Sequence, residues 1–198
     1  MKFDCTWPSS NPATTAKNDI VSVMQVLSDI IGDYATFIDT IAKKLKQNGF
    51  DLNDFSQMDH ICYRTVSLDN YAHKKEELSG IADLLGEKLV NNRLIAVFRL
   101  REPIIQNGWR VDCIELPAPK EGSPFEEGLE HAEMVIYDNK EKFLEKYKDK
   151  NFDMKSADRG INPEIGFYFD QYAVKFHLLS LATVLFIEEK MRINEVKD

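Results

Sequence analysis

Four side chains that can bind a divalent metal recur at similar places in the two halves of this sequence, namely His60, Glu115, His131 and His177. Each lies in a short apolar run that is typical of a β-strand. Imidazole nitrogens and carboxylate oxygens from separate strands are common ligands of divalent cations. His60 and His131 are 71 residues apart, and Glu115 and His177 are 62 apart. The spacing predicts one metal site, built from the first and last strands of two similar halves.

Glu133 is a candidate for chemistry because it shares a strand face with His131, alternate residues of a strand pointing to the same side. A buried carboxylate there could act as a general base, with its pKa raised by burial. It could instead accept a hydrogen bond that orients a ligand imidazole, which is the role we favour. A polar network that holds these groups together without a metal is the alternative for the whole cluster.

Arg64, Arg99 and Arg101 are the candidate substrate-binding residues. Arg99 and Arg101 alternate along one predicted strand, and two guanidinium groups in that arrangement suit the bidentate binding of a substrate carboxylate. Salt bridges to the many acidic residues of the chain are an equally good interpretation.

The elements around these residues form two β-α-β-β-β halves. In the first half, a strand at 60–65 and a helix at 69–86 precede strands at 88–91, 94–101 and 109–116. In the second half, a strand at 131–137 and a helix at 139–148 precede strands at 154–157, 165–169 and 173–179. One helix covers only one face of each sheet, so two halves can curl together and close their open faces into a cleft. The fold class is therefore α+β, with a curled mixed sheet.

The remaining segments complete a single domain over 1–198. An irregular arm at 1–18 precedes a helical segment at 19–56, where apolar residues recur at helical spacing and Gly32 is a possible break. The two modules then occupy 57–120 and 121–198, joined through a proline-rich connector. The second module ends in a helix at 180–191.

The composition limits the classes of partner. The net charge of −8 argues against nucleic acid, which needs a concentrated basic surface, but a small anionic ligand needs only one or two arginines. No signal peptide or membrane-spanning run is evident. The cysteines Cys5, Cys62 and Cys113 are odd in number and lack CxxC spacing, which indicates a reducing, cytoplasmic setting.

Three segments carry a resemblance to a known family: Met-Asp-His-Ile-Cys-Tyr-Arg-Thr (58–65), Val-Asp-Cys-Ile-Glu-Leu-Pro-Ala-Pro-Lys (111–120) and Phe-Glu-Glu-Gly-Leu-Glu-His-Ala-Glu-Met-Val-Ile (125–136). They resemble the bacterial YecM family, within the vicinal oxygen chelate superfamily of glyoxalase I and the extradiol dioxygenases. The resemblance implies metal ligands at His60, Glu115, His131 and His177. The last position departs from the glyoxalase pattern, which has a carboxylate there.

The resemblance implies a metal-dependent isomerase, epimerase or lyase, acting on a small substrate that chelates the metal through two oxygens. One carboxylate and three imidazoles suit Zn²⁺, Ni²⁺, Co²⁺ or Fe²⁺ better than Mg²⁺ or Ca²⁺. A non-catalytic protein that binds a small molecule in the same cleft is the first alternative. An interaction protein that docks through residues 20–45 is the second. We expect a monomer, with a dimer as the other possibility.

Overall fold

The computed structural model describes residues 12–120, 122 and 126–195, and the side chains of 12–21 and 193–195 lie outside that description. Most of the expected N-terminal arm, with Cys5, and part of the connector fall outside the described residues. The remainder of the arm differs from expectation, because helix α1 (Pro12–Ile31) already begins at Pro12. Proline is favoured in the first turn of a helix, where its missing N–H costs nothing.

The two expected β-α-β-β-β halves are present. The first half consists of β1 (Phe55–Arg64), α3 (Leu68–Ser79), β2 (Ala82–Val90), β3 (Arg93–Gln106) and β4 (Trp109–Pro117). The second half consists of β5 (Gly128–Ile136), α4 (Lys140–Lys146), β6 (Asp153–Ser156), β7 (Glu164–Phe169) and β8 (Tyr172–His177). The single-turn helix η1 (Leu52–Asp54) leads into β1, and α5 (Leu181–Glu195) follows β8.

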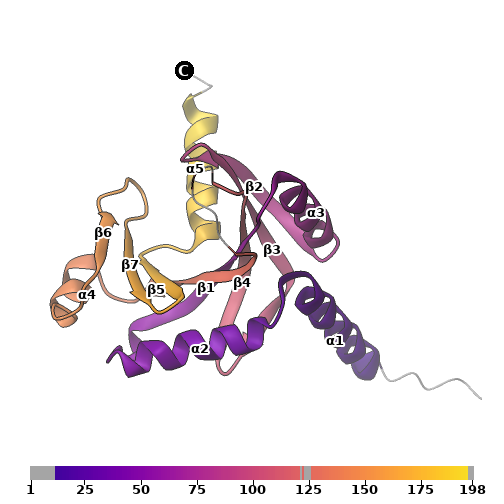
Figure 1. Ribbon diagram of the computed structural model, residues 1–198, viewed down its shortest axis with the longest axis horizontal. Helices are drawn as coiled ribbons and strands as arrows, with labels where there is room; N and C mark the ends of the chain where they lie inside the picture. Colours follow the sequence, from indigo (N-terminus) through magenta and orange to yellow (C-terminus); the bar gives the residue numbers. More distant parts are fainter. Residues whose placement is uncertain (1–11, 121, 123–125, 196–198) are drawn as a thin grey trace, which may run out of the picture.

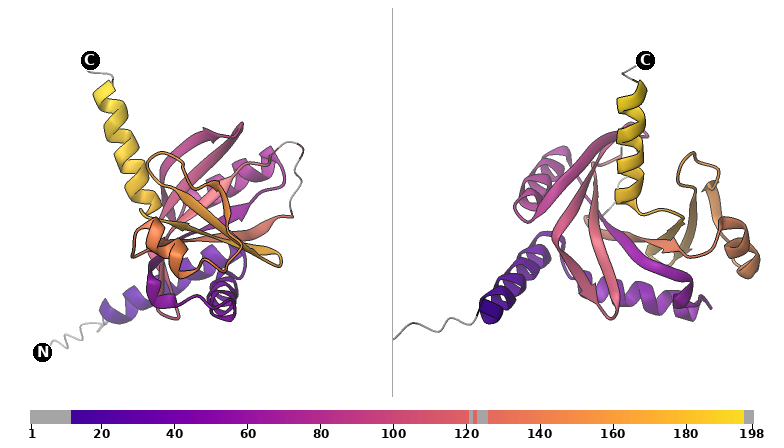
Figure 2. Two further views of the ribbon diagram at one scale, coloured as in Figure 1. Left: turned by 90° about the vertical axis from the view of Figure 1, so that its left-hand side faces the viewer. Right: turned by 180° about the vertical axis from the view of Figure 1, so that it is seen from behind.

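All eight strands form one mixed sheet in the order β2-β3-β4-β1-β5-β8-β7-β6. The order is symmetric, because β1 pairs with β4 in parallel and β5 pairs with β8 in the same way. The halves join where β1 and β5 run antiparallel. The outer strands of both halves bend to the same side of that junction, the side on which α5 stands (Figure 2). The predicted α+β class and curled sheet are therefore confirmed.

The predicted helix at 69–86 was too long. Ser67 caps the start of α3 by accepting a hydrogen bond from the Asn70 amide, and the helix ends at Ser79 with Gly80 at its C-cap. The following residues form β2, which pairs with β3 along its whole length. Non-local pairing with β3 thus outweighs the helical preference of the Leu- and Glu-containing segment.

The N-terminal helices cover the outer face of the sheet. α1 stops at Gly32, whose φ of +82° lies in the left-handed region, and α2 (Tyr34–Gln47) starts afresh with Asp33 as its N-cap. The expected break at Gly32 is therefore confirmed. The buried face of α2 consists of Phe37, Ile38, Ile41 and Leu45. Figure 1 shows α2 and α5 on opposite sides of β1 and β5.

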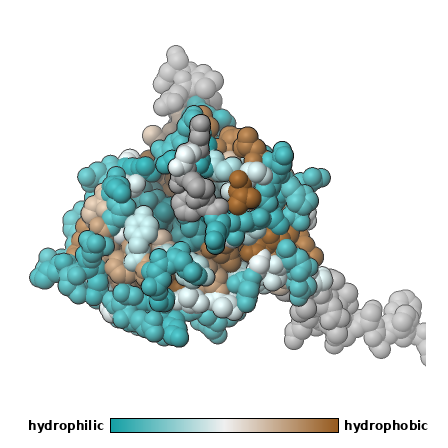
Figure 3. Space-filling view, in the orientation of Figure 1, coloured by the Kyte–Doolittle hydropathy of each residue, from teal (hydrophilic) through white to brown (hydrophobic). Residues whose placement is uncertain are grey.

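The face of the molecule in Figure 3 is mainly hydrophilic, with scattered hydrophobic areas. Exposed Leu84, Leu85 and Leu89 show that β2 contributes apolar side chains to the surface. No helix of the described chain is long and apolar enough to cross a membrane.

A partly exposed contact between α3 and β2 gives a testable pH dependence. Lys75 and Tyr71, both on α3, donate hydrogen bonds to the Glu87 carboxylate on β2 and hold its pKa below the ordinary value of 4.5. Because the folded-state pKa is depressed, this stabilisation is fully present above pH 4.5 and is lost as the pH falls through the lowered value.

We expect Glu87→Gln to reduce the loss of unfolding free energy between neutral and acid pH. The reduction should be under about 1 kcal/mol, because the pair is partly solvated. Urea denaturation at pH 7 and pH 3 measures the difference. Exposed Glu76→Gln is the matched control, since it removes the same formal charge. An equal pH dependence in both variants would contradict the assignment.

Candidate metal centre

The junction between the two halves places the predicted histidines symmetrically. The register of β1 and β5 is centred on the pair Ile61 and Ala132, so His60 lies opposite Glu133, and Cys62 lies opposite His131. Glu115 on β4 is paired with Cys62 on β1. Because alternate residues of a strand share a face, both histidines and both glutamates project to the same side of the sheet.

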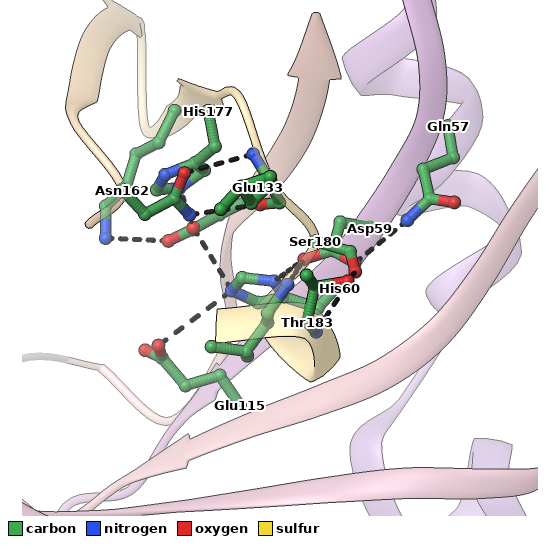
Figure 4. Close-up of polar contacts among 12 residues, drawn as sticks. Gln57, Asp59, His60, Glu115, Glu133, Asn162, His177, Ser180 and Thr183 are labelled. Carbon is green, nitrogen blue, oxygen red and sulfur yellow. Dashed lines mark hydrogen bonds and ion pairs between the residues drawn. The ribbon is translucent and has the colours of Figure 1, made fainter. Parts of the chain in front are cut away.

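Their ligand atoms converge on one point. His60 Nε2 lies 3.4 Å from Glu133 Oε2 and 3.9 Å from Glu115 Oε2. His131 Nε2 lies 3.2 Å from Glu133 Oε1 and 4.0 Å from Glu115 Oε1. The four ligand atoms all lie within 4.8 Å of one another, and Figure 4 shows His60, Glu115 and Glu133 pointing toward one another. Atoms each bound at about 2.1 Å to a common metal ion lie up to about 4.2 Å apart, so the nitrogen–oxygen distances of 3.2 to 4.0 Å fit such a site.

The unpartnered Nε2 atom of His60 favours a metal site over a polar network in which every group is hydrogen-bonded. Its Nε2 is buried and makes no hydrogen bond to any residue that the structure describes. A buried polar atom without a partner is costly, and a metal ion would satisfy it. The site also keeps an opening, because the Glu115 side chain is 13% exposed.

Each histidine is oriented by the acidic residue that precedes it. His60 Nδ1 donates to Asp59 Oδ2 at 3.0 Å, and His131 Nδ1 donates to Glu130 Oε2 at 3.0 Å. A proton fixed on Nδ1 leaves the Nε2 lone pair for a metal, an arrangement common around metal-binding histidines.

Two β-bulges make these neighbouring contacts possible. On β1, Met58 pairs with Met134 and His60 with Glu133, so Asp59 has no partner in the ladder. On β5, Glu130 is left over in the same way. Adjacent residues of a regular strand point to opposite faces, and a bulge turns one of them aside. The same irregularity therefore occurs at the equivalent place in both halves.

His177 lies beside this cluster, in a second group with Glu133 and Glu164. Its Nε2 is hydrogen-bonded to Glu133 Oε2, and its Nδ1 is buried without a hydrogen bond to the described chain. The strand registers explain its position. In the first half, Glu115 of β4 pairs with Cys62 of β1. The residue of β5 equivalent to Cys62 is Glu133, and its partner on β8 is Lys175.

Lys175 therefore occupies the position equivalent to Glu115, and His177 lies two residues further along β8. The Lys175 ammonium group donates to Glu133 Oε1 at 2.9 Å and lies 3.4 Å from Glu164 Oε2. His177 as the fourth metal ligand stays a prediction. In the described structure Glu133 is the fourth residue of the central cluster.

The general-base interpretation of Glu133 assumed a raised pKa, which the surroundings of this carboxyl do not favour. Burial raises its pKa, but His177, His60 and Lys175 in their protonated forms outweigh burial and hold it well below its ordinary value. For His60, burial lowers the pKa, and the Glu133 and Asp59 carboxylates raise it well above the ordinary value. An ionised Glu133 suits a ligand or an acceptor better than a base with a raised pKa.

The three predicted substrate-binding arginines are separated in the structure. Arg64 is buried, with its Nη1 at 3.3 Å from Glu130 Oε2, and so supports the carboxylate that orients His131. Arg99 lines a different cavity, between β2 and α5. Arg101 bonds to Asp83 and to the Gly80 carbonyl. The salt-bridge alternative therefore describes both Arg64 and Arg101.

Sequence reasoning assigned no role to Asp59 or Glu130, although an acidic residue before each histidine, 71 positions apart, was a usable signal. Cys62 and Cys113 are buried, and burial raises the pKa of both thiols, to about 12 for Cys113. Neither is therefore activated as a nucleophile.

Paired β-α-β-β-β halves around a histidine–carboxylate cluster define the class of this protein, an α+β fold with one curled mixed sheet. Within that class, the family model described as YecM protein matches residues 26–188. The chain therefore belongs to the YecM family.

Similar proteins agree with this assignment. Protein YecM of Escherichia coli K12 is 30% identical over 113 residues, which cover 56% of this chain and 58% of that protein. An uncharacterised protein of Haemophilus influenzae Rd is 29% identical over 117 residues, covering 59% and 61%. The chain thus matches less than two thirds of the length of either relative. A solved structure titled "Structural Genomics, Protein EC4020" has a TM-score of 0.66 at 22% identity, covering 83% of this chain and 92% of that one.

The central position of Glu133 predicts a large loss of stability when its charge is removed. We expect Glu133→Gln to destabilise the metal-free protein by about 3–5 kcal/mol, because buried His60 and His177 and half-buried Lys175 would lose their shared counter-ion. Urea denaturation in the presence of EDTA measures this loss. Glu126→Gln, at an exposed position, is the control. A loss no larger than that of the control would contradict a central role for the carboxylate.

Proposed function

We propose that this protein binds a divalent metal ion through His60, Glu115, His131 and Glu133. The observation that carries the proposal is the convergence of two Nε2 atoms and two carboxylates, with each Nδ1 already held by a bulged acidic neighbour. Zn²⁺, Ni²⁺, Co²⁺ and Fe²⁺ accept such mixed nitrogen and oxygen ligands.

The cavity beside the cluster supports a role in small-molecule chemistry. It has a volume of ≈ 400 Å³, within the range of ligand pockets, and Leu181, Val184 and Leu185 of α5 form part of its wall. A bound metal would act as a Lewis acid that polarises a carbonyl oxygen of a substrate.

The residues around the cluster support proton transfer during an isomerisation, an epimerisation or a lyase step. His177 lines the same cavity, and its Nδ1 has no hydrogen bond to the described residues. In the neutral form of the ring, with its proton on Nε2, this atom can accept a proton. Glu133 holds the opposite nitrogen of the ring and would stabilise the imidazolium that forms.

Binding without turnover is the second candidate, favoured by the three hydrogen bonds, to His131, Lys175 and His177, that already engage Glu133. Incubation with small 2-oxo acids in deuterated water distinguishes the two. Deuterium incorporation at carbon, detected by NMR, supports an enzyme, and binding without exchange supports the alternative. In either case we propose a small-molecule ligand rather than a nucleic-acid or membrane partner, and a cytoplasmic monomer, since one chain completes both halves of the sheet.

Metal content tests the site directly. We expect near-stoichiometric metal by elemental analysis of tag-free protein, and a marked loss in His131→Ala, which lacks one ligand. His73→Ala is the matched control, because that histidine lies on α3 with its side chain 67% exposed. An absence of metal in the wild type, with no change in Tm when Zn²⁺, Ni²⁺, Co²⁺ or Fe²⁺ is added, would contradict the proposal.

The bulged acidic residues have a separate expected effect. Asp59→Asn and Glu130→Gln keep the size of the side chain but remove the charge that holds each Nδ1 proton. We expect metal affinity to fall by roughly 10–100-fold in each variant, as measured by competition with a chromogenic chelator. Asp112→Asn on β4 is the control, and an equal affinity in all three variants would show that the orienting contacts have no influence.

A further inference from the structure

Arg93 occupies the wall of the metal-site cavity, although sequence reasoning assigned it no role. A two-residue turn at Asn91 and Asn92, with φ of 49° and 63°, connects β2 to β3 and makes Arg93 the first residue of β3. Asparagine is favoured at such positive φ values. Arg93, Ile95 and Val97 alternate along the strand and line the cavity. They face the same space as His60 and Glu115.

The guanidinium group of Arg93 has an unmet need for an anion. Its Nη1 is buried and forms no hydrogen bond with any described residue, and within the described chain Arg93 has no ion pair. Burial and the nearby positive charge of Arg64 lower its pKa, and the carboxylates of Glu115 and Glu130 act in the opposite direction. Arg93 is partly exposed as a whole, but a charged N–H group that is itself buried without a partner is unfavourable, so a bound anion would relieve the cost.

The other cations of the cavity are either paired or exposed to solvent. Lys175 contacts both Glu133 and Glu164, and Lys88 forms an ion pair with Glu188 of α5. Arg159, which also lines the cavity, is exposed and has no buried donor without a partner. The carboxylates of Glu115 and Glu133 would be committed to the metal. Arg93 is therefore the cation best placed to bind a negatively charged ligand group beside the metal centre.

We infer that Arg93 binds the anionic group of a small substrate whose two neighbouring oxygens bind the metal. The inference deepens the proposed function and rests on it for the position of the chelating end. The planar guanidinium suits a carboxylate, phosphate or phosphonate, because its N–H groups match two oxygens at once. The substrate class is thus a small oxygen-chelating acid with a second, anionic group.

Matched hydroxamates test this inference. Acetohydroxamate offers two neighbouring oxygens, and succinohydroxamate offers the same two with a carboxylate at the other end. Zn²⁺-loaded wild-type protein, Arg93→Gln and Arg93→Lys would be titrated with each compound by calorimetry. Arg110→Gln, an exposed arginine paired with Asp112, is the control.

We expect the carboxylated compound to bind wild type at least about tenfold more tightly than acetohydroxamate, as a charge-assisted hydrogen bond allows. Arg93→Gln should lose that gain while its affinity for acetohydroxamate stays unchanged, and Arg93→Lys should keep only part of it. The control should behave as wild type. Equal binding of the two compounds by wild type, or an undiminished gain in Arg93→Gln, would overturn the inference.

A failure of the metal site is recognised separately, because the Zn²⁺ titration comes first. If no Zn²⁺ binds, the proposed function fails, and succinate is then titrated into metal-free wild type and Arg93→Gln. Binding that depends on Arg93 would support the anion subsite in its own right. An absence of succinate binding, or equal binding by both proteins, would count against it.

Discussion

The antiparallel ladder between β1 and β5 is the contact on which the rest of the structure depends. It joins the two halves into one sheet, and its register determines which side chains meet at the centre. With Ile61 opposite Ala132, each half delivers one histidine across from a residue of the other half. A slip of one residue would turn all of these side chains to the opposite face. The register of this ladder therefore determines both how the core packs and how the site is assembled.

The ladder also contains the irregularities that the site needs. A regular strand would point Asp59 and Glu130 away from the histidines that follow them. The bulges at both positions turn the carboxylates towards Nδ1, at the cost of one unpaired residue in each strand. Arg64 then balances Glu130, while the amide of Leu181 and the side chain of Gln57 bond to Asp59. The residues that contact the two carboxylates thus differ between the halves, although both halves have the bulge.

The sequence predicted the parts of the site that depend on local pattern. Apolar runs located the strands, period two showed that Glu133 shares a face with His131, and the repeat indicated two equivalent halves. The sequence did not reveal relations between strands. The spacing of 62 residues suggested His177 as the counterpart of Glu115. The pairing of β8 with β5 instead places Lys175 at the position equivalent to Glu115. Such offsets depend on bulges and loop lengths, which no local pattern encodes.

The C-terminal helix has a bearing on when the site can form. The amide of Leu181, at the start of α5, donates to the Asp59 oxygen that also receives the His60 proton. Three of the four central residues lie on β1 and β5, and Glu115 lies on β4, so all four are synthesised well before α5. Asp59 nevertheless gains its full set of partners only when Leu181 has emerged. During translation, the orientation of His60 would therefore be fixed later than the strands that carry the four residues.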